Sequence, residues 1–122
     1  MARRFFRTSK LLRHADFQRV YKQGRRHFAA HMTVFYLRRQ DNEASGPRVG
    51  LTVGRVLGGA VQRNRIKRRL RQAVRDNLAS LALPVDVVIN PKKSVLSSQF
   101  MVLRDEVADA FRVLAEKESR RA

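Results

Sequence analysis

Apolar side chains recur at helical spacing near the start of the chain. A first helix is expected from about Arg13 to Lys22, and its apolar face carries Phe17, Val20 and Tyr21. Gly24 follows directly, and glycine is the residue that most often ends a helix in the left-handed conformation. The pattern therefore predicts a short amphipathic helix with a glycine cap.

Two longer helices are predicted further along. The first runs from about Ala60 to Leu81, and Pro84 is expected to end it because proline cannot continue a helix. Its apolar positions keep the spacing of one buried face; they are Ile66, Leu70, Ala73, Val74 and Leu78. The last helix, capped by Ser97 or Ser98, would bury the stripe Phe100, Leu103, Val107, Phe111 and Leu114.

Three segments between these helices have the features of strands. Residues 32–39 are rich in β-branched and aromatic side chains, residues 48–55 alternate valine or leucine with small residues, and residues 85–90 (Val-Asp-Val-Val-Ile-Asn) have the features of a buried strand. Residues 40–47 contain the usual turn-forming types. The order helix, strand, strand, helix, strand, helix predicts an α/β (α+β) two-layer sandwich, with three helices packed on a sheet of about four strands.

The length of 122 residues suits one domain with one core, so residues 1–122 are interpreted as a single domain, with 1–8 and 117–122 as candidates for disorder. The absence of cysteine excludes disulfides and cysteine-based zinc sites. No apolar run approaches the roughly 18 residues of a membrane span. The basic start lacks a following apolar stretch, so we expect a cytoplasmic protein rather than a secreted one, with a transit peptide as the minor alternative.

The net charge gives the clearest indication of function. Lys and Arg total 27 against 10 Asp and Glu, which gives a net charge of +17. Self-repulsion of that size calls for a polyanionic partner, and nucleic acid is the most common one. An acidic membrane surface and a generally basic soluble protein are weaker alternatives. No acid occurs between Glu43 and Asp76, so the positive charge is localised, as in a binding surface.

The densest cluster is Arg63-Asn64-Arg65-Ile66-Lys67-Arg68-Arg69-Leu70-Arg71. On a helix, Asn64, Arg68, Arg71 and Arg75 fall in one stripe opposite the apolar face, with Arg65 and Arg69 on one flank and Lys67 on the other. Guanidinium groups in such a row can each engage a phosphate. Cations near a helix N-terminus oppose its dipole, and this local cost favours a phosphate-binding role over a merely solvated face.

Aromatic residues form a second group. Phe17 and Tyr21 share a helix face, and Phe35 and Tyr36 point to opposite faces of one strand. Exposed aromatics beside basic residues stack the bases of single strands. Aromatic residues at helical spacing are more often core, so the pattern alone leaves both interpretations open.

Catalytic chemistry finds little support. Gly58-Gly59 lacks the lysine of a phosphate-binding loop. The three histidines His14, His27 and His31 have no convincing metal-ligand spacing, and the acids form no motif. We therefore expect neither a catalytic residue nor a metal site in this chain.

The motifs together resemble the bacterial ribonuclease P protein component. The resemblance rests on residues 48–55 (Arg-Val-Gly-Leu-Thr-Val-Gly-Arg), 59–61 (Gly-Ala-Val) and the run that begins Arg63-Asn64-Arg65. Residues 16–21 with Gly24, and residues 85–89, support it. It covers about residues 8–115 in the right order.

The resemblance implies an accessory subunit that binds a catalytic RNA and the 5′ leader of precursor tRNA. The RNA, with magnesium bound mainly by the RNA and the substrate, would perform the hydrolysis. A left-handed crossover between the strands that flank the long helix is also implied. By matching position, the leader cleft would contain Phe17, Tyr21 and Phe35, with Phe35 favoured over Tyr36 by ungapped alignment. The catalytic RNA would meet Arg63, Asn64, Arg65, Lys67, Arg68 and Arg71.

Two other classes compete with this interpretation. A ribosomal-type RNA-binding protein with no enzymatic partner shares the charge but has no need of a leader-binding aromatic surface. A helix-turn-helix DNA-binding module needs a recognition helix with varied polar side chains for base edges, whereas the basic helix here is directed at phosphates. We therefore expect neither DNA nor a membrane as a partner.

Overall fold

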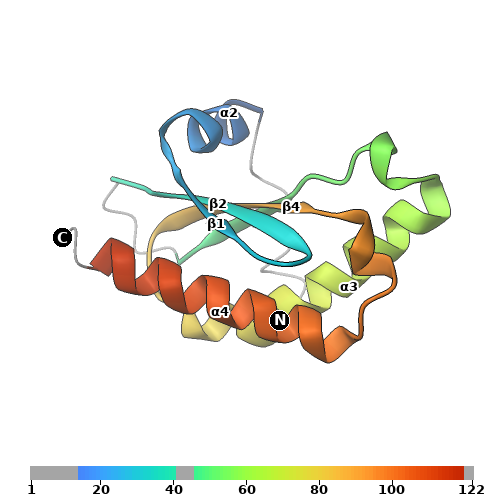
Figure 1. Ribbon diagram of the computed structural model, residues 1–122. Coiled ribbons are helices and arrows are strands. Elements are labelled where there is room, and N and C mark those ends of the chain that lie inside the picture. Colours follow the sequence, from blue (N-terminus) through green and yellow to red (C-terminus); the bar gives the residue numbers. More distant parts are fainter. Residues whose placement is uncertain (1–13, 41–45, 120–122) are drawn as a thin grey trace.

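The computed structural model describes residues 14–40 and 46–119, and within them one sheet has helices on both faces (Figure 1). The four strands are β1 (Arg25–Phe28), β2 (Met32–Arg38), β3 (Arg48–Leu51) and β4 (Val85–Pro91). Their order across the sheet is β1-β2-β4-β3. β2 pairs antiparallel with both β1 and β4, whereas β3 pairs parallel with β4. The last strand in sequence therefore lies in the middle of the sheet.

In the described part of the chain, three α-helices pack on this sheet. They are α2 (His14–Gln23), α3 (Ala60–Asn77) and α4 (Phe100–Ser119). α3 and α4 pack together under one face, and α2 lies over the other (Figure 1). Short 3-10 helices occupy Arg55–Leu57, Leu78–Ser80 and Lys93–Leu96. α3 connects the parallel neighbours β3 and β4, so the βαβ unit is present; its left hand stays a prediction of the resemblance.

The main core lies between the sheet and the α3–α4 layer. All five residues of the stripe predicted for α3 are buried, as are four of the five predicted for α4, with Phe100 partly buried at the edge. Alternate residues of β2 and β4 complete the core; they are Met32, Val34, Tyr36, Val85, Val87 and Ile89. The helical and strand periodicities of the sequence therefore identified the core correctly.

Several boundaries differ from expectation. β1 was not predicted, because its sequence Arg-Arg-His-Phe has no apolar alternation. The predicted strand 48–55 ends at Leu51, and residues 55–57 turn into a 3-10 helix. Residues 117–119, expected to be disordered, form the end of α4, where Glu118 is buried. The remaining candidates for disorder, 1–8 and 120–122, lie outside the described residues.

α3 ends at Asn77 and not at Leu81, before Pro84 is reached. The Asn77 amide donates to the carbonyl of Ala73 at 2.9 Å and to that of Arg104 at 3.1 Å. A side chain that bonds nearby backbone carbonyls competes with the helical hydrogen-bond pattern. Asn77 therefore helps to end α3 and ties that end to α4.

α2 ends directly before Gly24, as predicted, but the left-handed conformation predicted for Gly24 and the predicted serine caps are wrong. Gly24 has no positive φ, and among the described glycines only Gly58 does. A Cβ on Gly24 would lie 2.5 Å from the carbonyl oxygens of Val20 and Tyr36, so glycine is needed for close approach of the helix end to β2. α4 begins after Gln99, whose carbonyl accepts from Val102 and Leu103. The predicted serine caps do not bond there.

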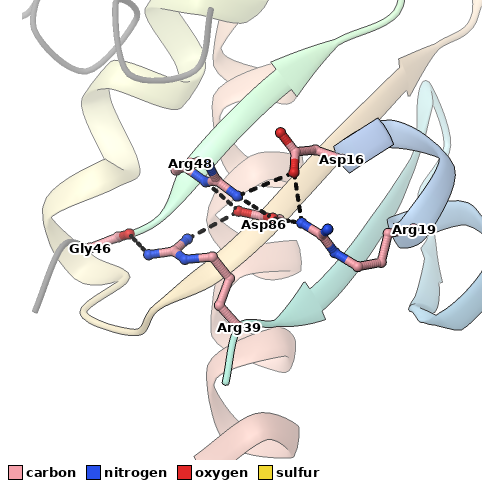
Figure 2. A network of polar contacts seen from close by, with 6 residues as sticks. All are labelled: Asp16, Arg19, Arg39, Gly46, Arg48 and Asp86. Carbon is pink, nitrogen blue, oxygen red and sulfur yellow. Dashed lines mark hydrogen bonds and ion pairs between the residues drawn. The ribbon is translucent and has the colours of Figure 1, made fainter. Parts of the chain in front are cut away.

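A buried carboxylate fastens α2 to the sheet (Figure 2). Asp86, on β4, is fully buried, and both of its oxygens accept from Arg48 at 2.7 Å. Arg39 donates to it at 3.0 Å. From α2, Arg19 lies 3.5 Å from Asp86 and donates to Asp16 at 2.7 Å. The network thus joins α2 to the ends of three strands.

We expect Asp86→Asn to lower the free energy of unfolding by about 3 kcal/mol, because it leaves the half-buried Arg39 and Arg48 without their counter-charge. Urea denaturation measures this. Asp109→Asn is the matched control, since its pair with Arg112 is exposed (side chains 70% and 60%) and should contribute less than about 1 kcal/mol. Equal losses in the two variants would contradict the central role of Asp86.

Candidate nucleic-acid interface

The outward face of α3 is basic along its first half. Asn64, Arg65 and Arg68 are exposed, while Lys67 and Arg71 are half-buried. A shallow depression of about 450 Å³ lies on this face, lined by Val61, Asn64, Lys67, Arg68 and Arg71. We call the four polar residues of this lining the basic face. Four of the six residues predicted to bind RNA from this helix therefore surround one hollow.

The start of α3 is left open for an anion. Its first turn holds no acid, and within the described residues no side chain caps it. Gly58, with φ of 130°, and Gly59 lead the chain into the helix. Free N–H groups at a helix start attract phosphates. The helix end and the basic face therefore favour the same kind of ligand.

Not every arginine of the cluster faces outward. Arg69 is half-buried and donates to the carbonyl of Ser98, which ties α3 to the segment before α4. Arg63 is also half-buried, and its Nε has no hydrogen-bond partner among the described residues. Arg69 is thus a packing residue, and Arg63 lies at the margin of the exposed surface.

A second surface lies on the opposite side of the sheet, beside α2. The rings of Tyr21 and Phe35 meet edge to face with centroids 4.9 Å apart. The guanidinium of Arg26, on β1, lies 5.3 Å from the centre of the Phe35 ring, within the range of a cation–π contact. We call Tyr21, Phe35 and Arg26 the aromatic platform. It combines flat apolar surface with positive charge.

Hydrogen bonds hold the platform in place. The Tyr21 hydroxyl donates to Asn90 Oδ1 at 3.0 Å, and the Thr52 hydroxyl donates to the same oxygen. Asn90 and Thr52 come from β4 and the end of β3, so the tyrosine is anchored to the middle of the sheet. A ring fixed in this way loses little conformational freedom when a base stacks on it.

The structure separates the aromatic candidates. Tyr36 is 1% exposed and belongs to the main core, whereas Phe35 is half-buried on the α2 side. Phe17 is half-buried one helical turn before Tyr21, but it does not enter the Tyr21–Phe35 ring pair. None of Phe17, Tyr21 and Phe35 belongs to the core cluster. The three residues therefore lie outside the main core, and their role in binding a ligand stays a prediction.

Sequence reasoning missed three partners of this surface. Arg26 was missed together with β1, whose four residues have no strand pattern. Asn90 and Thr52 carried a weak signal, since each is a polar residue in or next to an apolar strand. Buried or half-buried polar groups need partners, and that rule would have singled out Asn90.

The acids of the described chain are largely engaged with basic groups. Asp16 and Asp86 pair with arginines in the network of Figure 2, and Glu106 lies 3.5 Å from His31. Among the described residues, no group of three or more His, Asp or Glu side chains could hold a metal ion. No helix in residues 14–40 and 46–119 is long and apolar enough to cross a membrane.

Comparison with known proteins gives one consistent result. A family described as Ribonuclease P matches residues 5–115. The ribonuclease P protein component of Acidothermus cellulolyticus is 39% identical over 97 residues, which span 80% of each chain. That of Citrifermentans bemidjiense is 37% identical over 113 residues, 93% of this chain and 94% of its own.

Solved structures agree on the fold. The RNase P protein of Thermotoga maritima superposes with a TM-score of 0.71 at 25% identity, covering 83% of this chain and 92% of its own. That of Staphylococcus aureus gives a TM-score of 0.70 at 24% identity, covering 84% and 91%. The strand order and the helical layers are therefore shared with proteins of that name.

Proposed function

The chain belongs to the ribonuclease P protein family, the RNA-binding subunits of the endoribonuclease that matures the 5′ end of tRNA, and from this premise we propose which surface holds which RNA. The basic face of α3 binds the catalytic RNA. The aromatic platform, with Phe17, binds the single-stranded 5′ leader of precursor tRNA. The ribosomal-type alternative is not favoured, because every relative named above is a ribonuclease P protein.

The observation that carries this assignment is the separation of two chemically different surfaces. The basic face presents cations around a hollow, and such a surface suits a folded phosphate backbone. Arg63 and Arg65 are on the same helix but outside the lining of the hollow, and they would extend the contact with RNA. The platform instead offers ring faces next to Arg26, a combination that suits unstacked bases of a single strand.

The chemistry is assigned to the RNA partner. The acids of this chain that pair with arginines, Asp16 and Asp86 above all, neutralise those side chains and are poorly placed to bind a metal. The required magnesium would be held mainly by the catalytic RNA and the substrate. The protein would act in the cytoplasm by binding and positioning both RNAs.

Reconstitution tests this assignment. We expect rigorously RNA-free protein to leave precursor tRNA uncut at any magnesium concentration. Adding the protein to the catalytic RNA should lower the enzyme concentration needed for leader removal, measured by gel analysis of the released leader. Cleavage by the protein alone would contradict the accessory role.

We expect Arg68→Ala to weaken binding of the catalytic RNA by about tenfold, as for loss of one charge-assisted hydrogen bond. The slope of log affinity against log salt concentration should become shallower by about one. Filter binding over a salt series measures both. Arg112→Ala, which removes an exposed arginine of α4, is the matched control and should change neither. An unchanged slope for Arg68→Ala would exclude the basic face as the docking surface.

We expect Phe17→Ala to cost roughly 1–3 kcal/mol of affinity for precursor tRNA and little for mature tRNA, which has no leader to stack. Its melting temperature should change little, because Phe17 lies outside the core cluster. Phe111→Ala, at a core position that is 1% exposed, is the contrasting control: it should lose about 3–5 kcal/mol of stability. A Phe17 variant that melts early and loses both ligands equally would contradict the leader assignment.

A further inference from the structure

A row of side chains crosses the open end of the sheet beyond the aromatic platform. The register pairs Phe28 of β1 with Thr33 of β2, and Thr33 with Asn90 of β4. Thr52, just after β3, continues the row, since it donates to Asn90. Directly paired residues point to the same face of a sheet. We call these four residues the open row.

The open row lies on the same face as the platform. In the neighbouring register, Arg26 pairs with Phe35, and residues two apart along a strand share a face. Phe28 and Thr33 therefore flank Arg26 and Phe35 on the side of the platform. Tyr21 connects the two sets, because its hydroxyl donates to Asn90. A single-stranded RNA that extends from the platform towards Phe28 would therefore meet the open row next.

The middle of the row offers directed hydrogen-bond donors. Asn90 Oδ1 accepts from both Tyr21 and Thr52, so its orientation is fixed. No bond from its amide nitrogen is made within the described residues. Its two N–H groups are thus available to acceptors such as base carbonyls or phosphate oxygens.

Phe28 ends the row on the edge strand. It is 72% exposed and contributes nothing to the core cluster. Its strand also carries Arg25, Arg26 and His27 and has no acid, so the charge around it complements a polyanion. An exposed ring beside basic groups, in register with a stacking platform, is suited to a base of single-stranded RNA.

We propose that the RNA strand held by the aromatic platform continues across the open row and stacks a further base on Phe28. The occupant is the part of the 5′ leader that lies beyond the nucleotides held by Tyr21 and Phe35. This inference rests on the proposed function of the platform and extends it to β1. Phe28 lies two residues along β1 from Arg26 of the platform, a distance of about 7 Å, so Phe28 serves only leaders long enough to extend past the platform.

The test uses the reconstituted enzyme and precursor tRNAs whose leaders are lengthened one nucleotide at a time. Single-turnover cleavage gives the enzyme concentration at half-maximal rate. Phe28→Ala raises this concentration about fivefold, the lower end of the stacking range, only for leaders above a threshold length. Phe35→Ala has its effect from a shorter leader onward. Phe28→Tyr, which keeps the ring, behaves like the unaltered protein.

Met101→Ala is the matched control, since Met101 is a 55% exposed apolar residue on α4, in the layer across the sheet. It changes no leader's cleavage. Melting curves check that Phe28→Ala is folded, and no change in melting temperature is expected because Phe28 is exposed. If the cleavage rate of Phe28→Ala equals that of the unaltered protein at every leader length, the proposal is wrong. The leader-binding function of the platform still holds in that case if Phe35→Ala weakens cleavage. Loss of both effects overturns the platform as well.

Two further outcomes also overturn the proposal. Equal weakening of all leaders and of mature tRNA by Phe28→Ala would place Phe28 against the catalytic RNA. A lower molecular mass of the variant in light scattering would place it between two copies of the chain, which could pair through the edge strand β1.

Discussion

The burial of one carboxylate, Asp86, is the constraint on which the working surface of this protein depends. Three arginines, from α2, β3 and the residue after β2, converge on Asp86, and Asp16 of α2 forms ion pairs with two of them (Figure 2). A buried charge is tolerated only when it is fully paired. α2 is consequently held to the sheet at one end, and its ring Tyr21 is held against Phe35.

The basic face and the aromatic platform are separate surfaces because the helices pack differently on the two faces of the sheet. The α3–α4 layer contains the main core on its inner side, so the outward side of α3 can carry a high density of cations. The opposite face of the sheet is only partly covered by α2, so aromatic and polar side chains remain accessible there. The two surfaces share no residue, so the two RNA ligands of the proposed function would not compete for the same side chains.

Periodicity predicted the core, the helices and most of the sheet, because burial of one face imposes regular spacing. It failed where tertiary contacts decide. β1 is a strand through pairing with β2 and not through its own composition, and Gly24 is required by the nearby Tyr36 carbonyl. The basic face could be predicted from the sequence, because its residues lie in a segment that contains no Asp or Glu. Arg26, Asn90 and Thr52 could not be assigned to the platform, since their neighbours are remote in sequence.

The central position of β4 has a consequence for how the chain folds. β2 and β3 both pair with β4, which is synthesised only after α3. Arg38 and Arg48 therefore cannot pair with Val85 and Asp86 until those later residues have been made. Contacts between such distant residues form slowly. During synthesis the arginines of the network have been made well before their buried counter-ion. Until Asp86 is made, an emerging chain of this kind carries these guanidinium groups without their buried counter-ion, so a nearby polyanion can bind them in its place.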